Sequence, residues 1–112
     1  MAQTNPPFMS GVPELLVLRL LARREMYGYE LVKLIKATTR DAIALGEGVV
    51  YPALYSLEQK GALKARRKTV NGRSRVYYSV TAKGRKRLQH LTEQWERISN
   101  GVRSVLEEPS RA

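Results

Sequence analysis

Hydrophobic and polar residues recur along this chain first with the period of helices and then with that of strands. The segment from Val12 to Arg24 is apolar nearly all round a helix. Pro13 suits its first turn, because a proline nitrogen has no hydrogen to leave unpaired there. Such a helix needs burial on two sides, so we expect one side to meet its own domain and the other a partner subunit. A turn at 26–29, in which Gly28 takes a positive φ, and a second helix over about 28–38 follow. The inner stripe of that second helix is Leu31, Leu34 and Ile35.

Pro52 sets the start of the third predicted helix. Proline is harmless only in the first turn, so we expect the helix to begin near Gly48 or Val49 and to end at Gly61. The segment 38–45 before it is the turn of a helix-turn-helix. The predicted inward residues are Val50, Leu54 and Leu57, the predicted outward residues are Val49, Ala53, Ser56 and Lys60, and Tyr51 and Tyr55 lie on the flanks.

Two strands follow, over Leu63 to Val70 and Ser74 to Val80, joined across Asn71-Gly72. Asn-Gly is a strong signal for a tight hairpin, because both residues accept the positive φ that such a turn needs. Alternate residues of the second strand predict one core face, made of Val76, Tyr78 and Val80. The cations left to project from this wing are Lys64, Arg66, Lys68, Arg73 and Arg75.

The last predicted helix begins after Thr81, a good N-cap residue, and runs to about Leu106. Its apolar residues recur at alternating spacings of three and four, which is the heptad pattern of a coiled-coil seam. A bundle contact inside one chain could use the same seam, but the chain offers few other long helices. We therefore expect a second copy to pair there. The seam residues are Leu88, Leu91, Trp95, Ile98, Val102 and Val105.

Together these elements predict an α+β fold that is mostly α, a winged helix-turn-helix with a long C-terminal dimerisation helix. The length of 112 residues suits one domain. We expect a flexible N-terminal arm over 1–11, which could equally be tag or linker sequence, and a DNA-binding domain over 12–80. The dimerisation helix covers 81–108, and a tail covers 109–112. No apolar run is long enough to cross a membrane, and the first ten residues lack the pattern of a secretory signal.

Charge is concentrated on the hairpin and on the start of the last helix. Between Gln59 and Thr92 there are 11 basic residues and no Asp or Glu, while the other 9 basic and 10 acidic residues nearly cancel. The window therefore carries +11 and the rest of the chain −1, so the whole net charge of +10 belongs to this window. A solvated surface is the simpler explanation, but an acid-free stretch of this length favours an anionic polymer as partner. A helix leading into a cationic hairpin is typical of winged helices that bind DNA.

Catalytic and metal chemistry find little support in the composition. The absence of cysteine excludes disulfides, thiolate zinc sites and a cysteine nucleophile, and it fits a reducing, cytoplasmic setting. The single histidine, His90, lies on the basic side of the last helix, and no pair of acids suggests acid–base catalysis. No glycine-rich phosphate loop follows a strand. We therefore expect no enzyme activity, no cofactor and no metal.

Three motifs, in order and at matching spacing, resemble the PadR-like transcriptional regulators. They are 27–31 (Tyr-Gly-Tyr-Glu-Leu), 48–58 with Gly61, and 72–81 with Gly84. The resemblance covers roughly 12–106. It implies a dimeric bacterial or archaeal winged-helix regulator of the short form, which ends in a single dimerising helix. Two residues depart from the family: Gly46 replaces Ser or Thr, and Val49 replaces Thr, so a cap and a phosphate or base contact are lost.

The predicted DNA contacts divide into phosphate and base contacts. Phosphates would bind Lys60, Lys64, Arg66, Lys68 and the Tyr51 hydroxyl, which position the protein without sequence information. Arg75, which also projects from the wing, is expected to contact DNA as well. Arg73, beside the hairpin tip, could enter a minor groove. Val49, Ala53 and Ser56 would face the bases, with apolar contacts to thymine methyl groups. A two-fold dimer predicts a palindromic operator.

Trp95 is the only tryptophan and occupies a seam position. It is large for a tight two-stranded coil, so two copies near a symmetry axis could leave a gap for a planar aromatic effector. The expected lining is Trp95, Leu15, Leu18 and Leu91. The resemblance adds that some short family members are multidrug sensors with such a site. The simpler alternative is that Trp95 packs on Leu15 and Leu18.

Two other functions stay open at this point. An RNA-binding or non-specific nucleic-acid-binding winged helix would use the same cations, although dimer symmetry suits palindromic DNA better. A dimerisation adaptor would need no localised charge. The sequence thus favours a sequence-specific regulator of transcription, and the resemblance to the family favours a repressor.

Overall fold

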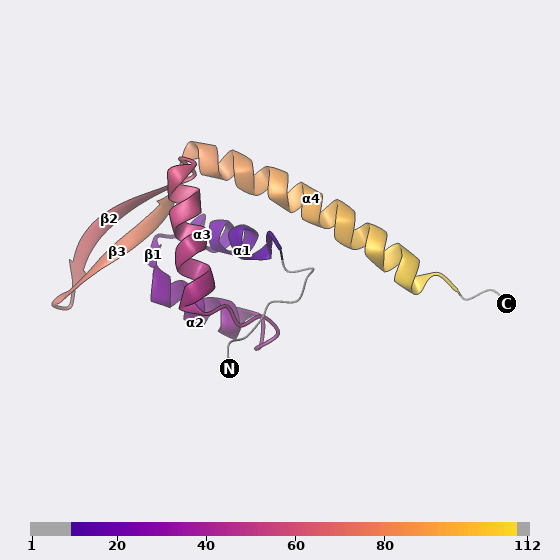
Figure 1. Cartoon of the computed structure of the whole chain (residues 1–112), viewed down its shortest axis with the longest axis horizontal. Helices are drawn as coiled ribbons and strands as arrows, with labels where there is room; N and C mark the ends of the chain where they lie inside the picture. Colours follow the sequence, from indigo (N-terminus) through magenta and orange to yellow (C-terminus); the bar gives the residue numbers. More distant parts are fainter. Residues whose placement is uncertain (1–9, 110–112) are drawn as a thin grey trace.

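The computed structural model describes residues 10–109 as a winged helix followed by one long helix (Figure 1). The bundle consists of α1 (Val12–Leu21), α2 (Gly28–Thr38) and α3 (Glu47–Gln59), and the final helix is α4 (Ala82–Glu107). The strands β1 (Met26–Tyr27), β2 (Leu63–Val70) and β3 (Arg73–Val80) form an antiparallel sheet in the order β1-β3-β2. This confirms the predicted fold class. Most of the predicted arm, residues 1–9, and most of the tail, residues 110–112, lie outside the described residues.

The core fills the space between the three helices and one face of the sheet. Each helix contributes the residues that recur every three or four positions, because these share one side of a helix. The predicted inward residues of α3, Val50, Leu54 and Leu57, are fully buried and confirm that part of the pattern. The other buried members include Val17, Leu18, Leu21, Met26, Leu31, Ile35, Leu45, Ala62 and Leu63.

The segment that joins α1 to α2 differs from the prediction. α1 ends at Leu21 rather than Arg24, because Met26 and Tyr27 form β1 and pair with Tyr78 and Tyr77 of β3. The predicted turn at 26–29 was therefore wrong. Gly28 is the first residue of α2 and is not among the residues with positive φ. Its small size has another use, since a Cβ there would come within 2.5 Å of the Tyr51 ring.

Helix α3 begins at Glu47, before the predicted start near Gly48 or Val49. Gly46 is its N-cap, and the carbonyl of Gly46 accepts from the N–H groups of Val49 and Val50 at 3.0 Å. Pro52 consequently lies inside the helix, beyond its first turn. Proline there leaves the Gly48 carbonyl without its usual helical donor. Gly48 and Pro52 are both exposed, so water can satisfy that carbonyl.

The hairpin has the predicted turn. Asn71 and Gly72 have φ values of 53° and 76°, the positive angles that a two-residue hairpin loop requires. Tyr78 and Val80 pack against the core as expected, whereas Val76 lies farther out and is half-buried. Tyr77, on the opposite face, is nevertheless buried. The cause is β1, because Tyr27 lies beside Tyr77 and covers it.

Helix α4 is fastened to the end of α3 by Thr81, the predicted N-cap. The Thr81 hydroxyl accepts from the Gly84 N–H at 3.1 Å and donates to the Gly61 carbonyl at 2.6 Å, and the Thr81 N–H donates to Ala62 O at 3.0 Å. The helix then runs past α1 and away from the winged helix (Figure 1). Within residues 10–109, no helix combines the length and the apolar character that crossing a membrane requires.

Candidate nucleic-acid interface

The solvent-exposed side of α3 carries tyrosines rather than the small residues expected. With 3.6 residues per turn, the positions opposite the buried row of Val50, Leu54 and Leu57 are those near Gly48, Pro52 and Tyr55. Tyr55 is 66% exposed. The predicted outward residues fare differently: Ser56 and Lys60 are exposed, but Ala53 is half-buried. Val49 is half-buried and packs against the core, so the prediction that it points outward was wrong.

Tyr51 lies between α3 and the start of α2. Its ring rests against Gly28, which has no side chain to hold it away. The ring remains exposed, as predicted for a phosphate contact. Tyr29, at the same end of α2, is also exposed and has the Lys33 ammonium 5.2 Å from its ring centroid. Aromatic and cationic side chains thus gather where α2 begins beside α3.

The wing presents two faces because side chains alternate along its strands. The outer face carries Lys64, Arg66 and Lys68 of β2 opposite Ser79, Tyr77 and Arg75 of β3. The inner face carries Leu63, Ala65 and Arg67 of β2 opposite Val80, Tyr78 and Val76. Four of the five predicted wing cations therefore share the outer face, and Arg73 lies at the tip.

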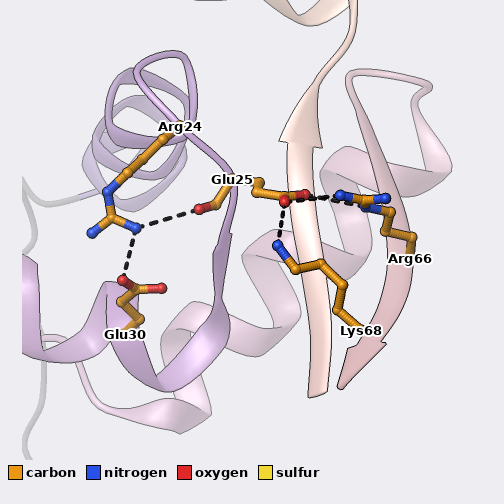
Figure 2. A network of polar contacts seen from close by, with 5 residues as sticks. All are labelled: Arg24, Glu25, Glu30, Arg66 and Lys68. Carbon is orange, nitrogen blue, oxygen red and sulfur yellow. Dashed lines mark hydrogen bonds and ion pairs between the residues drawn. The ribbon is translucent and has the colours of Figure 1, made fainter. Parts of the chain in front are cut away.

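Glu25 binds two of these cations (Figure 2). Its carboxylate accepts from Lys68 Nζ at 2.6 Å, from Arg66 Nη2 at 3.0 Å and from Arg66 Nε at 3.3 Å. The hydrogen bond from Arg66, followed by that from Lys68, lowers the pKa of Glu25 to about 2. The carboxylate is therefore ionised at neutral pH and offsets part of the positive charge of the outer face.

Aromatic rings hold Lys68 and a further wing cation, Arg75. Arg75 lies with its guanidinium carbon 4.3 Å from the Tyr27 ring centroid, and Lys68 Nζ is 4.5 Å from that of Tyr77. The two rings meet edge to face, with centroids 5.5 Å apart. Arg75 and Lys68 are thus packed on tyrosines, an arrangement that fixes their position as well as their charge.

Other basic residues have no such partners. Among the described residues, Lys60, Lys64 and Arg73 have neither an ion pair nor a side-chain hydrogen bond to protein, and all three are exposed. Arg67, which the sequence prediction left out of the interface, lies on the inner face and donates to Ser74 Oγ at 3.3 Å. No three His, Asp or Glu side chains in residues 10–109 come together to hold a metal ion.

Sequence reasoning missed Glu25, Tyr55 and Arg67. Glu25 lies 41 residues before Arg66, outside the basic window, and only the pairing of β1 with β3 brings it to the wing. A count of helical positions from the buried row of α3 would have identified Tyr55. The alternation of side chains along β2 would have placed Arg67 on the other face of the strand from its two basic neighbours.

Along α4 the predicted seam changes from buried to exposed. Leu88 is buried and Leu91 packs against the core, whereas the later apolar residues are in contact with solvent. Trp95 is 49% exposed and does not pack within the core cluster with Leu15. Leu18 has no exposed surface, so its prediction as a ligand contact was wrong. The exposed seam residues are Trp95, Ile98, Val102 and Val105, and Leu106 beside them is also exposed.

A groove of about 390 Å³ separates the end of α1 from α4. Arg19, Arg23 and Arg85 line it together with Glu93 and Glu96, above Leu88. Trp95 is not among its lining residues, so the predicted aromatic site is distinct from this groove.

Comparison with known proteins gives a consistent result. The model of the transcriptional regulator PadR-like family matches residues 17–90. Transcriptional regulator Rv3488 of Mycobacterium tuberculosis is 30% identical over 99 residues, covering 88% of this chain and 87% of that protein. A transcriptional regulator from Clostridium thermocellum superposes with a TM-score of 0.82 at 27% identity, covering 88% of this chain and 97% of its own. A PadR-like transcriptional regulator from Bacillus cereus gives 0.80 at 27% identity, with 93% and 100% covered.

Proposed function

This chain belongs to the PadR-like family of transcriptional regulators, which are DNA-binding proteins, and on that premise we propose that it is a homodimeric repressor with a palindromic operator. We further propose that a small planar aromatic ligand releases it from DNA. The observation that carries the proposal is the row of cations on a wing that lies beside α3, whose outer side is exposed. Figure 1 shows the hairpin next to α3.

DNA binding would use α3 and the wing together. The exposed residues of α3, with Tyr55 among them, would enter the major groove, and the tip residue Arg73 would reach an adjacent minor groove. Lys60 and Lys64 would hold phosphates, since both are exposed and have no protein partner among the described residues. Of the predicted base contacts, Ser56 and Ala53 remain, whereas Tyr55 takes the place of Val49.

Dimerisation is supported by the exposed seam of α4. Trp95, Ile98 and Val102 recur at heptad spacing and lie in water in a single chain. A contiguous apolar stripe of this kind usually marks an interface. Pairing with a second α4 would bury it and would place two wings on opposite sides of a two-fold axis, which matches a palindromic operator.

The ligand would bind where two Trp95 side chains approach the dimer axis. Thr81 and Gly84 fasten the start of α4 to the end of α3 through Gly61 and Ala62. A ligand that changes the angle between the two copies of α4 would therefore also change the separation of the two recognition helices. Binding affects DNA affinity only if the ligand prefers one of these separations.

The experiment is a titration of the full chain by fluorescence anisotropy. The duplex from upstream of its own gene is compared with a scrambled duplex and a structured RNA over a series of salt concentrations. We expect preference for the upstream duplex and a steep loss of affinity with salt. Equal binding to both duplexes, or preference for the RNA, would refute a sequence-specific DNA regulator.

A further inference from the structure

Glu25 lies where a DNA phosphate would be expected to meet the wing. Its two oxygens accept from Arg66 Nη2 and Nε, and Lys68 Nζ adds a third donor at 2.6 Å (Figure 2). This pairing of a planar guanidinium with two oxygens is the one that arginine also makes with phosphate. We propose that Glu25 fills a phosphate-binding site on the outer face of the wing, and that a DNA phosphate binds Arg66 and Lys68 only by displacing it. The inference rests on the proposed function and specifies what controls one of its contacts.

The site is open to an incoming anion. The Arg66 side chain is 67% exposed although it is paired. A hollow of about 380 Å³ lies beside it, lined by Glu25, Lys64, Ala65, Arg66 and Ser79. Lys64 adds another cation and Ser79 a hydroxyl, both of which suit phosphate oxygens. A phosphate can therefore approach the guanidinium without any rearrangement of the sheet.

Displacement of Glu25 need not disturb the fold. The Arg66 side chain is 67% exposed, and those of Glu25 and Lys68 are 27% and 33% exposed, so solvent reaches the ion pairs and limits their contribution to stability. The backbone of the turn has its own support, since Arg24 Nη1 donates to the Glu25 carbonyl at 3.4 Å and pairs with Glu30 at 2.8 Å (Figure 2). The Glu25 side chain can thus rotate away while its backbone stays in place.

The Glu25 carboxylate and a DNA phosphate compete for Arg66 and Lys68 with the same charge. A carboxylate and a backbone phosphate each carry one negative charge and accept the same hydrogen bonds. Glu25 has the advantage of being tethered beside its partners, whereas DNA offers a phosphate together with the rest of the duplex. Glu25 therefore lowers the number of phosphates that the wing neutralises, and with it the salt dependence of binding.

The test compares Glu25→Gln with Glu30→Gln. Both substitutions remove one negative charge, but Glu30 pairs with Arg24 and does not touch the wing. Each full-length variant is titrated with the same duplex from about 50 to 200 mM salt. We expect the log–log slope to steepen by about one to two for Glu25→Gln only, so that its gain in affinity shrinks roughly fourfold to sixteenfold over that range.

A second variant distinguishes a new phosphate contact at Arg66 from a general effect of the protein's net charge. Adding Arg66→Ala to Glu25→Gln should return the slope toward that of the wild type. If Glu25→Gln instead matches Glu30→Gln, or binds DNA more weakly than the wild type, the proposal is overturned. This test can be told apart from the test of the proposed function. If the wild type showed no preference for its upstream duplex, the salt slopes of the wild type and the variants could still be compared on any duplex.

Discussion

Gly84 lies at the point where α4 meets the end of α3, and we predict that Gly84→Ala destabilises the protein. A Cβ at this position would collide with the backbone oxygen of Ala62 and would come within 2.8 Å of Val80 Cγ1. A backbone oxygen cannot rotate away as a side chain can. The start of α4 would therefore have to shift, which strains the hydrogen bonds from Thr81 to Gly61 and Ala62.

Two opposing effects decide the magnitude. Alanine is favoured over glycine inside a helix by about 1 kcal/mol, which would stabilise the variant. Forcing a methyl group into a packed site typically costs about 1–3 kcal/mol. The clash involves backbone as well as a side chain, so we expect the cost to exceed the gain and to lower the free energy of unfolding by about 1–2 kcal/mol.

Gly101→Ala is the matched control, because Gly101 lies in the same helix and a Cβ there would meet nothing within 4 Å. We expect it to stabilise the protein by up to about 1 kcal/mol. Unfolding is followed thermally at equal protein concentrations, since association with a second copy would shift Tm. A Gly84→Ala variant that melts at or above the temperature of the wild type would refute the reasoning about this junction.

Four further predictions concern the wing and the seam. The pKa of Glu25 is lowered from 4.5 to about 2 in the folded chain, so its ion pairs stabilise the fold fully above pH 4.5 and lose that effect as the pH falls through about 2. An NMR titration of the Glu25 carboxyl carbon should show this low pKa, and Arg66→Ala should raise it. Arg73→Ala should weaken DNA binding roughly tenfold while sedimentation shows an unchanged dimer, and unaltered affinity would remove the wing tip from the interface. Ile98→Asp should yield monomers in sedimentation, and a dimer that persists would contradict the role of the seam. Trp95→Ala should abolish the heat released when an aromatic ligand binds but spare DNA binding, and an unchanged heat would contradict the ligand site.

The elements with strong local signals were predicted well. Asn71-Gly72 accepts positive φ values at low cost, so the position of the hairpin turn followed from two residues. Thr81 caps α4 through a hydrogen bond made within one turn of the helix, and such contacts are visible in the sequence. The inward row of α3 followed from helical periodicity alone.

The errors arose where contacts between distant segments decide the structure. The two residues of β1 are too few to show alternation, and they become a strand only because β3 offers an unpaired edge. Pro52 was expected to lie in the first turn of α3, but the buried row of α3 stabilises a helix that begins earlier, and the Gly48 carbonyl that Pro52 leaves unpaired is exposed to water. Val49 lies close enough to that row to pack against the core.

The charge map shows most clearly what the sequence alone could not provide. Between Gln59 and Thr92 there is no acid, so every cation of the wing seemed equally available to DNA. The sheet brings Glu25 of the α1–β1 turn next to Arg66 and Lys68 and sets Tyr27 under Arg75. Cations that are neighbours in sequence therefore differ in availability, because Arg66, Lys68 and Arg75 already have an anion or an aromatic ring as partner, whereas Lys64 on the same face has none among the described residues. The number of phosphates that a wing binds depends on the partners that the fold supplies as well as on its count of basic residues.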